Sequence, residues 1–591
     1  MTNFLDHYTL KYTPLSPVHI GTGDSYEPTN YVIDEGTLYE FDTGGALVAL
    51  NDSDKNELVK VVNGKPNTDM LKAVQKFFYI RREALKPWAI NTIPVLDGVA
   101  RLYASRVGQT ANREGDGSQI INKLEIDRTA YNPITRQPIL YGSSIKGAIR
   151  TALLSHENKK EPLSARDKEQ FLVENLNAYE RKQRERAQKK IYPRLNEKLF
   201  GFSAGKFELD PMRFVQIGDA SWSTQDNLPA AQVLITVNRK KELKRDKHGN
   251  ELLSSAEKNE NLCKLLECIP AWRYQAFTGQ LNLQLINCIH QSNKQPNANL
   301  RFTMEQIAKR CSNFYIPILN AERVAMRDRG FLDQTWDKNI QLLLGKMKEK
   351  IINGQAFLIR VGRHSGAESI TLNGVRYIKI MKGTPEYQAQ TKTLWLAANY
   401  PKQRKDLIPF GWLLVEINPI NSPEINGAEL EKLCNNQHTQ AQEWANKQIK
   451  EKENLAEKRK ESEQRYIREE NDRRQQAEHS QRQEQEKKQA EQQKAEQIRL
   501  QQEADRQRRA SMTEQQLQIE TLKQQLQQKQ NANIREQIGG PLYSALRELI
   551  NQTSAWSDDD KAELLGVAKQ ILEFISASSN KKAKELLKNL Q

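Results

Sequence analysis

A long stretch without proline or glycine places the strongest constraint on this 591-residue chain. From about Gln440 to Arg535 the sequence consists mainly of Glu, Lys, Gln, Arg and Ala, which are strong helix formers. Trp444, Ile449 and Leu455 do not keep the a/d spacing of a heptad repeat. We therefore expect a charge-stabilised single helix or a partly disordered arm, in preference to a coiled coil.

A small helical module is expected after this arm. Gly539-Gly540-Pro541 should end the arm, and the apolar residues that follow, such as Leu542 and Leu546, recur at helical spacing. Ser557 is followed by three aspartates, which is the pattern of a capped helix N-terminus. Apolar stripes on short helices suit a protein partner.

The composition indicates a soluble, basic protein. The chain has 89 Lys and Arg against 74 Asp and Glu, and the net charge of +15 suits a polyanionic partner. Its five cysteines show no CxxC spacing, so we expect no metal site, disulfide framework or cofactor, and a reducing compartment. No apolar run approaches the ~20 residues of a membrane span, so a cytoplasmic location is expected.

The first part of the chain resembles an α+β sandwich of the ferredoxin-like kind. Alternation from Tyr8 to Ile20 predicts a strand that enters a glycine loop at 17–24. A hairpin is expected around residues 34–36, then a helix at about 69–85. Residues 87–138 are expected to be irregular, with a mobile loop at 113–117.

A second α+β unit is expected further along. Strands are predicted at 214–217, 233–237, 280–286, 357–361 and 411–417, and a hairpin is predicted at Asn373-Gly374. A basic helix should run from about 164 to 200 with a break at Pro193, and another from 304 to 350 with interruptions near Pro317 and Gly330. The expected domains are two ferredoxin-like units at 1–204 and 205–420, a charged helical arm at 421–539 and a helical module at 540–591.

The stretch from Tyr141 to Leu154 predicts an anion site. Ser143 or Ser144 is expected to cap a short helix, and Lys146 and Arg150 lie four residues apart on one face. Hydroxyls, unpaired helix amides and two cations then converge, and phosphate is the natural ligand for such a group. A capped surface helix with two solvated basic residues is the alternative reading.

Several motifs together make the chain resemble the RAMP superfamily of CRISPR-associated proteins, above all the fifth Csm-type subunit of type III effector complexes. The resemblance covers about residues 1–420. It is carried by residues 17–23 (PVHIGTG), 142–150 (GSSIKGAIR), 199–201 (LFG), 210–214 (DPMRF) with Asp219, 362–366 (GRHSG) and 407–412 (LIPFGW).

This resemblance implies a ferredoxin-like, RRM-related core and a role in antiviral defence. The subunit would cap a filament built on CRISPR RNA, hold the 3′ part of the guide, and contact other effector subunits, with a maturation nuclease as a further candidate partner. Binding would be directed mainly at the RNA backbone. The expected RNA-binding residues are His19, Gly21, Gly23, Ser143, Ser144, Lys146, Gly147, Arg150, Gly362, Arg363, His364, Ser365 and Gly366.

Two alternatives stay open. Some relatives in this family cleave RNA, and His19 or Asp24 beside the first glycine loop is the candidate catalytic group. General acid–base cleavage needs a second titratable group, which the local sequence does not supply, so we expect no catalytic residue. The other alternative is a scaffold in which the charged arm recruits proteins and the core is only an anchor.

Overall fold

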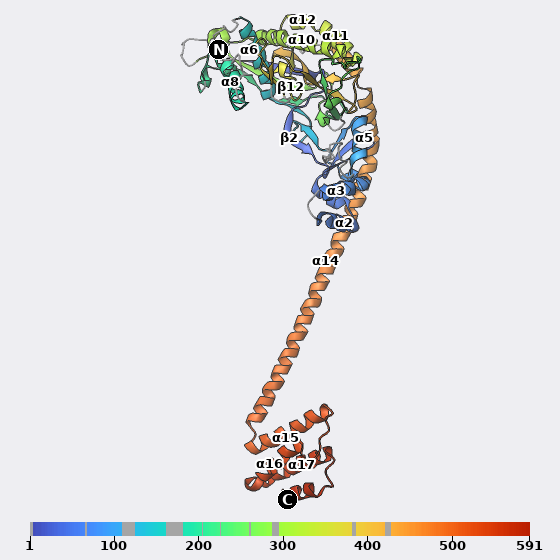
Figure 1. Ribbon diagram of the computed structural model, residues 1–591, viewed down its shortest axis with the longest axis vertical. Helices are drawn as coiled ribbons and strands as arrows, with labels where there is room; N and C mark the ends of the chain where they lie inside the picture. Colours follow the sequence, from blue (N-terminus) through green and yellow to red (C-terminus); the bar gives the residue numbers. More distant parts are fainter. Residues whose placement is uncertain are drawn as a thin grey trace. The chain divides into compact units, whose positions relative to one another are not determined.

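The computed structural model describes residues 4–64, 68–108, 124–160, 181–203, 205–224, 226–258, 262–285, 295–380, 386–419 and 427–590. The chain forms two compact units, Met1–Glu469 and Glu470–Gln591 (Figure 1). The boundary between them falls inside one continuous helix, α14 (Thr439–Ala510). The helix expected for the charged stretch is therefore confirmed for residues 439–510. Its expected end at Gly539-Gly540-Pro541 is wrong, because the helix ends at Ala510 and a new helix, capped by Thr513, begins at Glu514. The expected loop at 113–117 lies outside the described residues.

The first sheet of unit 1 is antiparallel and is centred on β1 (Leu5–Pro14). Its strand order is β13 (Ala356–Arg360), β18 (Trp412–Pro419), β1, β12 (Phe277–Gln284), β9 (Ala220–Trp222), β7 (Ile139–Leu140), and β8 (Val215–Ile217) also pairs with β12. Helices α6 (Gly142–Lys160) and α10 (Met304–Asp328) pack on each other and against β13. Burial of Leu10, Tyr12, Phe277 and Trp412 fixes this packing.

The second sheet carries the first glycine loop into its edge strand. The order is β17 (Ile408–Pro409), β16 (Thr393–Ala398), β10 (Gln232–Lys240), β11 (Lys264–Cys268), β6 (Ile126–Thr129), β2 (Gly21–Tyr26). All pairs are antiparallel except β11 with β6. Mixed α/β architecture is thus confirmed.

The two sheets do not follow one another along the chain. β1 pairs with β12 and β18, while β6 pairs with β11, so each sheet takes strands from both sides of residue 204. The expected boundary at 204/205 therefore does not separate two sheets. Pairing between strands so far apart in the sequence cannot be predicted from local patterns, because alternation identifies a strand but not the strand with which it pairs.

A smaller three-stranded sheet lies between β2 and β6 in the sequence. It consists of β3 (Tyr31–Asp34), β4 (Thr37–Glu40) and β5 (Asn91–Pro94), and the expected hairpin around 34–36 is confirmed. Helices α1 (Thr43–Ala49), α2 (Asp52–Val62), α3 (Thr68–Ile80) and α4 (Arg82–Leu85) complete it with an apolar cluster of their own. The stretch expected to be irregular, 87–138, also contains α5 (Asp97–Arg106).

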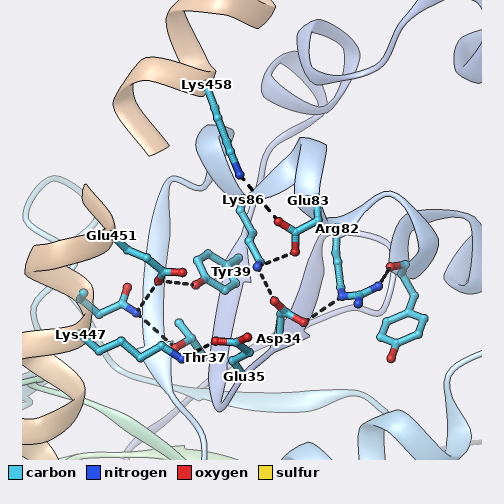
Figure 2. Close-up of polar contacts among 12 residues, drawn as sticks. Asp34, Glu35, Thr37, Tyr39, Arg82, Glu83, Lys86, Lys447, Glu451 and Lys458 are labelled. Atoms are coloured by element: carbon cyan, nitrogen blue, oxygen red, sulfur yellow. Dashed lines mark hydrogen bonds and ion pairs between the residues drawn. The ribbon is translucent and has the colours of Figure 1, made fainter. Parts of the chain in front are cut away.

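The first part of α14 packs on this small sheet, as Figure 2 shows. Trp444 Nε1 donates to Thr37 Oγ1 (2.9 Å) and Lys447 pairs with Glu35 (2.5 Å). Further along, Trp88 Nε1 donates to Ser462 Oγ (2.8 Å). Residues 439–469 are therefore part of the folded core unit and are not a free arm.

Unit 2 has its own apolar core, built by four helices after α14. These are α15 (Glu514–Asn531), α16 (Pro541–Asn551), α17 (Asp558–Phe574) and α18 (Lys581–Lys588). Ile519, Leu522 and Leu526 of α15 are buried in this core, so the helical module begins well before the expected residue 540. The Ser557 cap is confirmed, because its side chain accepts from the Asp560 amide.

Three predictions that rest on proline or turn residues are wrong. Helix α10 continues through Pro317, and α8 (Arg181–Phe200) continues through Pro193, since both helices bury apolar faces that outweigh the lost hydrogen bond. Asn373-Gly374 forms a turn, but this turn does not connect two paired strands. Among the described residues, the hairpin nearest to it pairs β14 (Ile378–Ile380) with β15 (Glu386–Gln388).

The remaining elements of unit 1 are α9 (Ser255–Lys258), α11 (Gln334–Lys346), α12 (Lys348–Ile352) and α13 (Ala428–Asn435), with short 3-10 turns between them. The expected interruption near Gly330 is confirmed, because α10 ends at Asp328. Within the described ranges, no helix has both the length and the apolar character that crossing a membrane requires.

Candidate nucleic-acid interface

The two glycine loops, residues 17–24 and 362–366, lie against each other although they are far apart in the sequence. The Arg363 amide donates to the His19 carbonyl (2.8 Å). Next to this contact, the amide of Gly411, in the 407–412 segment, donates to the Pro17 carbonyl (2.9 Å). Gly362 has a φ of +81°, and a Cβ there would lie 2.3 Å from the His19 carbonyl oxygen. Glycine is required at 362 because the two loops touch through their backbones.

His19 is a buried structural residue. Its Nδ1 lies 2.7 Å from the Glu267 carbonyl oxygen and must donate to it. Burial lowers the pKa of the imidazole, so it is neutral near pH 7. Its side chain has no exposed surface, which corrects its expected role as an RNA contact. Asp24 is exposed on β2, and its amide bonds Thr22 Oγ1 (3.0 Å).

Arg363 and His364 differ in exposure and in charge, and therefore in the contacts that they can make to a ligand. Arg363 is 35% exposed and its guanidinium pairs with Asp127 of β6. His364 stacks on Trp395, with ring centroids 4.7 Å apart. Burial, with help from the Arg363 charge, lowers the pKa of His364 to about 3, so this ring carries no charge for a phosphate. Ser365 is buried beside them.

Exposed Lys264 on β11 adds positive charge beside this loop. It acts on His364 in the same direction as Arg363, lowering the pKa of the imidazole. Lys264 and Trp395 were missed by sequence reasoning, because only strand pairing brings β11 and β16 to the 362–366 loop. No local signal in the sequence identifies either residue.

The N-terminus of α6 is arranged differently from the expected cap. The helix begins at Gly142, and the amides of Ser144 and Ile145 both bond the Tyr141 carbonyl (3.0 and 3.2 Å). The Gly142 amide donates to Asp219 Oδ1 (2.7 Å). Both serines therefore lie inside the first turn. The Asp219 carboxylate already accepts a hydrogen bond from one of the N-terminal helix amides, that of Gly142.

Lys146 and Arg150 do not form a matched pair of free cations. Arg150 donates to Asn196 Oδ1 (2.9 Å) and Asp210 Oδ2 (2.8 Å), so two donors of its guanidinium are engaged within the fold, and its expected phosphate contact stays a prediction. Lys146 is half-buried, and burial lowers its pKa. The exposed positions of the first turns are Ser143 and Gly147.

Gly147 leaves an open strip on α6. A Cβ at this position would meet nothing within 4 Å, and Ser143 lies one turn before it. Such a strip of small residues lets the sugar–phosphate backbone of a nucleic acid approach the helix closely, and Lys146 lies next to the strip.

A short hydrogen-bond path joins the first glycine loop to α6. The Ala130 amide donates to the Ile20 carbonyl (2.7 Å), and the Ile139 amide donates to the Ala130 carbonyl (2.9 Å). Helix α6 begins three residues after Ile139. The structure thus joins both glycine loops directly and connects α6 to them through one strand segment.

Gly21 and Gly23 lie on the exposed part of β2, and Gly366 lies where the second loop turns into a short 3-10 helix. These three glycines place backbone, without side chains, at the surface of the loop pair. Among the described residues, no group of three or more His, Cys, Asp or Glu side chains is placed to hold a metal ion.

Comparisons with known proteins give one family match. A sequence model of the RAMP superfamily matches residues 11–356, which includes the first glycine loop and α6. A search of curated proteins gives no significant match.

Two solved structures are similar at a low level. A chain in the cryo-EM structure of a Csm-crRNA-target RNA ternary complex of a type III-A CRISPR-Cas system is 16% identical, with a TM-score of 0.37; the match covers 70% of this chain and 100% of that chain. The crystal structure of T. onnurineus Csm5 is 16% identical, with a TM-score of 0.34, and covers 68% and 99% respectively.

Proposed function

This chain belongs to the RAMP superfamily, and from that membership we propose that it is a non-catalytic RNA-binding subunit of a type III CRISPR effector complex. It would cap the filament and hold the 3′ part of the CRISPR RNA. The observation that carries the proposal is the direct contact of the two glycine loops beside Arg363 and Lys264. Exposed backbone next to cations suits a ribose–phosphate strand.

We also propose that the first sheet is a ferredoxin-like unit. The strands β18, β1, β12 and β9 are neighbours in that order. Helix α6 lies between β1 and β9 in the sequence, and α10 lies between β12 and β18, which gives the βαββαβ sequence of that fold. The helical unit 470–591, which has its own core, supports a second role in docking other effector subunits.

RNA cleavage is not favoured by the arrangement of the candidate groups. His19 is buried and neutral, while Asp24 lies exposed on β2. General acid–base chemistry needs two titratable groups that both reach the reacting atoms. Loss of RNA cleavage on His19→Ala or Asp24→Asn in the purified protein would overturn the non-catalytic assignment.

RNA binding to the full chain is tested by fluorescence anisotropy across a salt series. Lys146→Ala should weaken binding and reduce the slope of log K against log salt by about 0.7, the value for one phosphate contact on a single strand. Gly147→Glu should also weaken binding, since it places a carboxylate on the open strip of α6. Lys569→Ala, an exposed lysine of unit 2, is the control and should change neither affinity nor slope.

Unchanged affinity in both α6 variants would remove α6 from the interface. Failure of the unaltered protein to bind RNA at any salt concentration would overturn the proposed function as a whole.

A further inference from the structure

A cavity of about 470 Å³ lies behind the second glycine loop. Its walls come mainly from α10, from the 364–368 segment and from β16 with the residues just before it, and α6 contributes Ser155 and Lys159. This volume lies within the range of pockets that bind small ligands. We call it the His364 cavity.

One wall of the His364 cavity is an aromatic stack. His364 and Trp395 both line the cavity, and their rings lie at an interplanar angle of 25°. Phe410 also packs on the imidazole, with ring centroids 5.5 Å apart and the rings tilted by 50°. Because His364 is neutral, the stack is a flat, uncharged platform, which is the surface that nucleobases prefer.

The backbone of His364 supports the idea that this platform has a binding role. Its φ is +63°, a left-handed conformation that is uncommon for a residue with a side chain. Backbone strain of this kind persists only where the surroundings hold it, and it is concentrated at ligand-binding sites.

The other lining groups carry an excess of positive charge. Four cations, Lys159, Lys241, Arg360 and Arg376, face two carboxylates, Glu322 and Glu368. Arg360 pairs with Glu322 (2.9 Å) and Lys241 pairs with Glu368 (2.7 Å). Both carboxylates are therefore neutralised by one pair of cations, and Lys159 and Arg376 supply the excess.

Arg376 has donor capacity to spare. Its Nη2 donates to the Glu368 carbonyl (3.1 Å), but its Nε is buried and has no hydrogen-bond partner among the described residues. A buried donor without a partner is costly, and an anion would satisfy it. Lys159 is exposed and has no ion pair within the described part of the chain. A phosphate therefore suits this side of the cavity.

We propose that the His364 cavity binds one nucleotide of a single-stranded RNA. The base would stack on His364 and Trp395, and the phosphate would be held by Arg376 and Lys159. Since His364 and Gly366 belong both to the glycine loop and to the cavity wall, a strand crossing the loop can turn one base inward. The inference rests on the proposed RNA-binding function and adds a nucleotide pocket to it.

The test uses the full chain with three probes: an RNA of about 12 nucleotides, which exceeds one small binding site, the four nucleoside monophosphates, and inorganic phosphate. Ultraviolet cross-linking followed by mass spectrometry should place uridine on His364 or Trp395. Trp395→Leu should weaken RNA binding about tenfold, the effect of losing one stacked base. Trp395→Phe keeps a ring and should bind within about twofold of the unaltered protein.

The charge on the cavity is tested separately. Arg376→Gln should weaken RNA binding and flatten the salt slope, whereas Lys405→Gln, an exposed charge change outside the cavity, should leave the slope unchanged. Unfolding temperatures of all variants separate a binding loss from a folding loss.

Each remaining outcome has a definite meaning. If RNA binds but cross-links elsewhere, and Trp395→Leu binds it normally, the nucleotide pocket is wrong while the RNA-binding function stands. If RNA does not bind but a monophosphate does, and Trp395→Leu abolishes that binding, the cavity serves a free nucleotide and the RNA source is wrong. If inorganic phosphate binds as tightly as every monophosphate, the base platform is wrong.

Discussion

Gly362 is the residue on which the contact between the two loops depends. Its φ of +81° and the 2.3 Å approach to the His19 carbonyl exclude a side chain on two separate grounds. Gly374 has almost the same φ, +82°, but nothing lies within 4 Å of a Cβ there. Comparing alanine substitutions at these two glycines therefore separates the cost of backbone strain from the cost of a steric clash.

We predict that Gly374→Ala costs roughly 1–2 kcal/mol of stability, the cost of a left-handed alanine. Gly362→Ala should cost at least about 2 kcal/mol more, because the His19 backbone must move. Urea unfolding of unit 1 measures both. Equal losses would mean that the loops separate without penalty, and the interface would then lack a fixed loop pair.

Glu267 predicts a pH dependence of stability that has an unusual sign. It is buried under the first glycine loop, where it accepts from Tyr26 OH (2.8 Å) and the Thr129 amide (3.0 Å). Burial raises the pKa of its carboxyl to about 7. The folded state therefore keeps a proton that the unfolded chain releases near pH 4.5.

The stabilisation from protonated Glu267 is complete below about pH 4.5 and is lost as the pH rises through 7. Across this window the unfolding free energy should fall by about 3 kcal/mol more in the unaltered protein than in Glu267→Gln. Buried His19 titrates in both proteins, so the difference between them isolates Glu267. Parallel pH profiles would show that Glu267 is ionised in the folded state.

At the scale of elements, the contact between α14 and the small sheet is directional. The Trp88 indole donates to Ser462 Oγ (2.8 Å), and Arg459 lies over the Trp88 ring at 4.6 Å from its centroid. The hydrogen bond and the ring contact can be separated, since phenylalanine retains only the second.

A double-mutant cycle of Trp88→Phe and Ser462→Ala should give a coupling of about 1 kcal/mol, the net value of a partly buried hydrogen bond. Ser480→Ala, at an exposed position on the same helix, should show no coupling to Trp88→Phe. Additive single effects at 88 and 462 would indicate that α14 is held by apolar contacts alone.

Helices, strands and hairpins were predictable where the pattern is local. The 34–36 hairpin and the Ser557 cap follow from a few adjacent residues, and the helical state of the charged stretch follows from its composition, but its end at Ala510 was not predicted. The partners of those elements were not predictable. Asp127 pairs with Arg363, and Asp210 pairs with Arg150, only because distant strands and helices meet. For the same reason, neither the burial of His19 nor the ion pair of Arg150 could be predicted from its local sequence.

At the scale of the whole molecule, the expected boundary of the arm matters for any dissection. A cut near residue 440 removes Trp444, Ser462 and Leu455, and Leu455 packs on the apolar cluster of α1–α4. A cut after Glu469 leaves every one of these contacts in place and removes only unit 2. The first truncation therefore tests what the base of α14 contributes to unit 1, and the second tests the role of unit 2 alone.

A chain ending at Glu469 should keep the unfolding temperature of unit 1 and its RNA affinity. A chain ending at His438 should unfold at least about 5 °C lower, because an apolar surface and two indole hydrogen bonds are lost together. Calorimetry and anisotropy on both chains make the comparison. Loss of RNA affinity in the longer one would assign binding to unit 2. Retained affinity with failed assembly into an effector complex would make unit 2 the docking module, reached through a helix whose base belongs to the RNA-binding core.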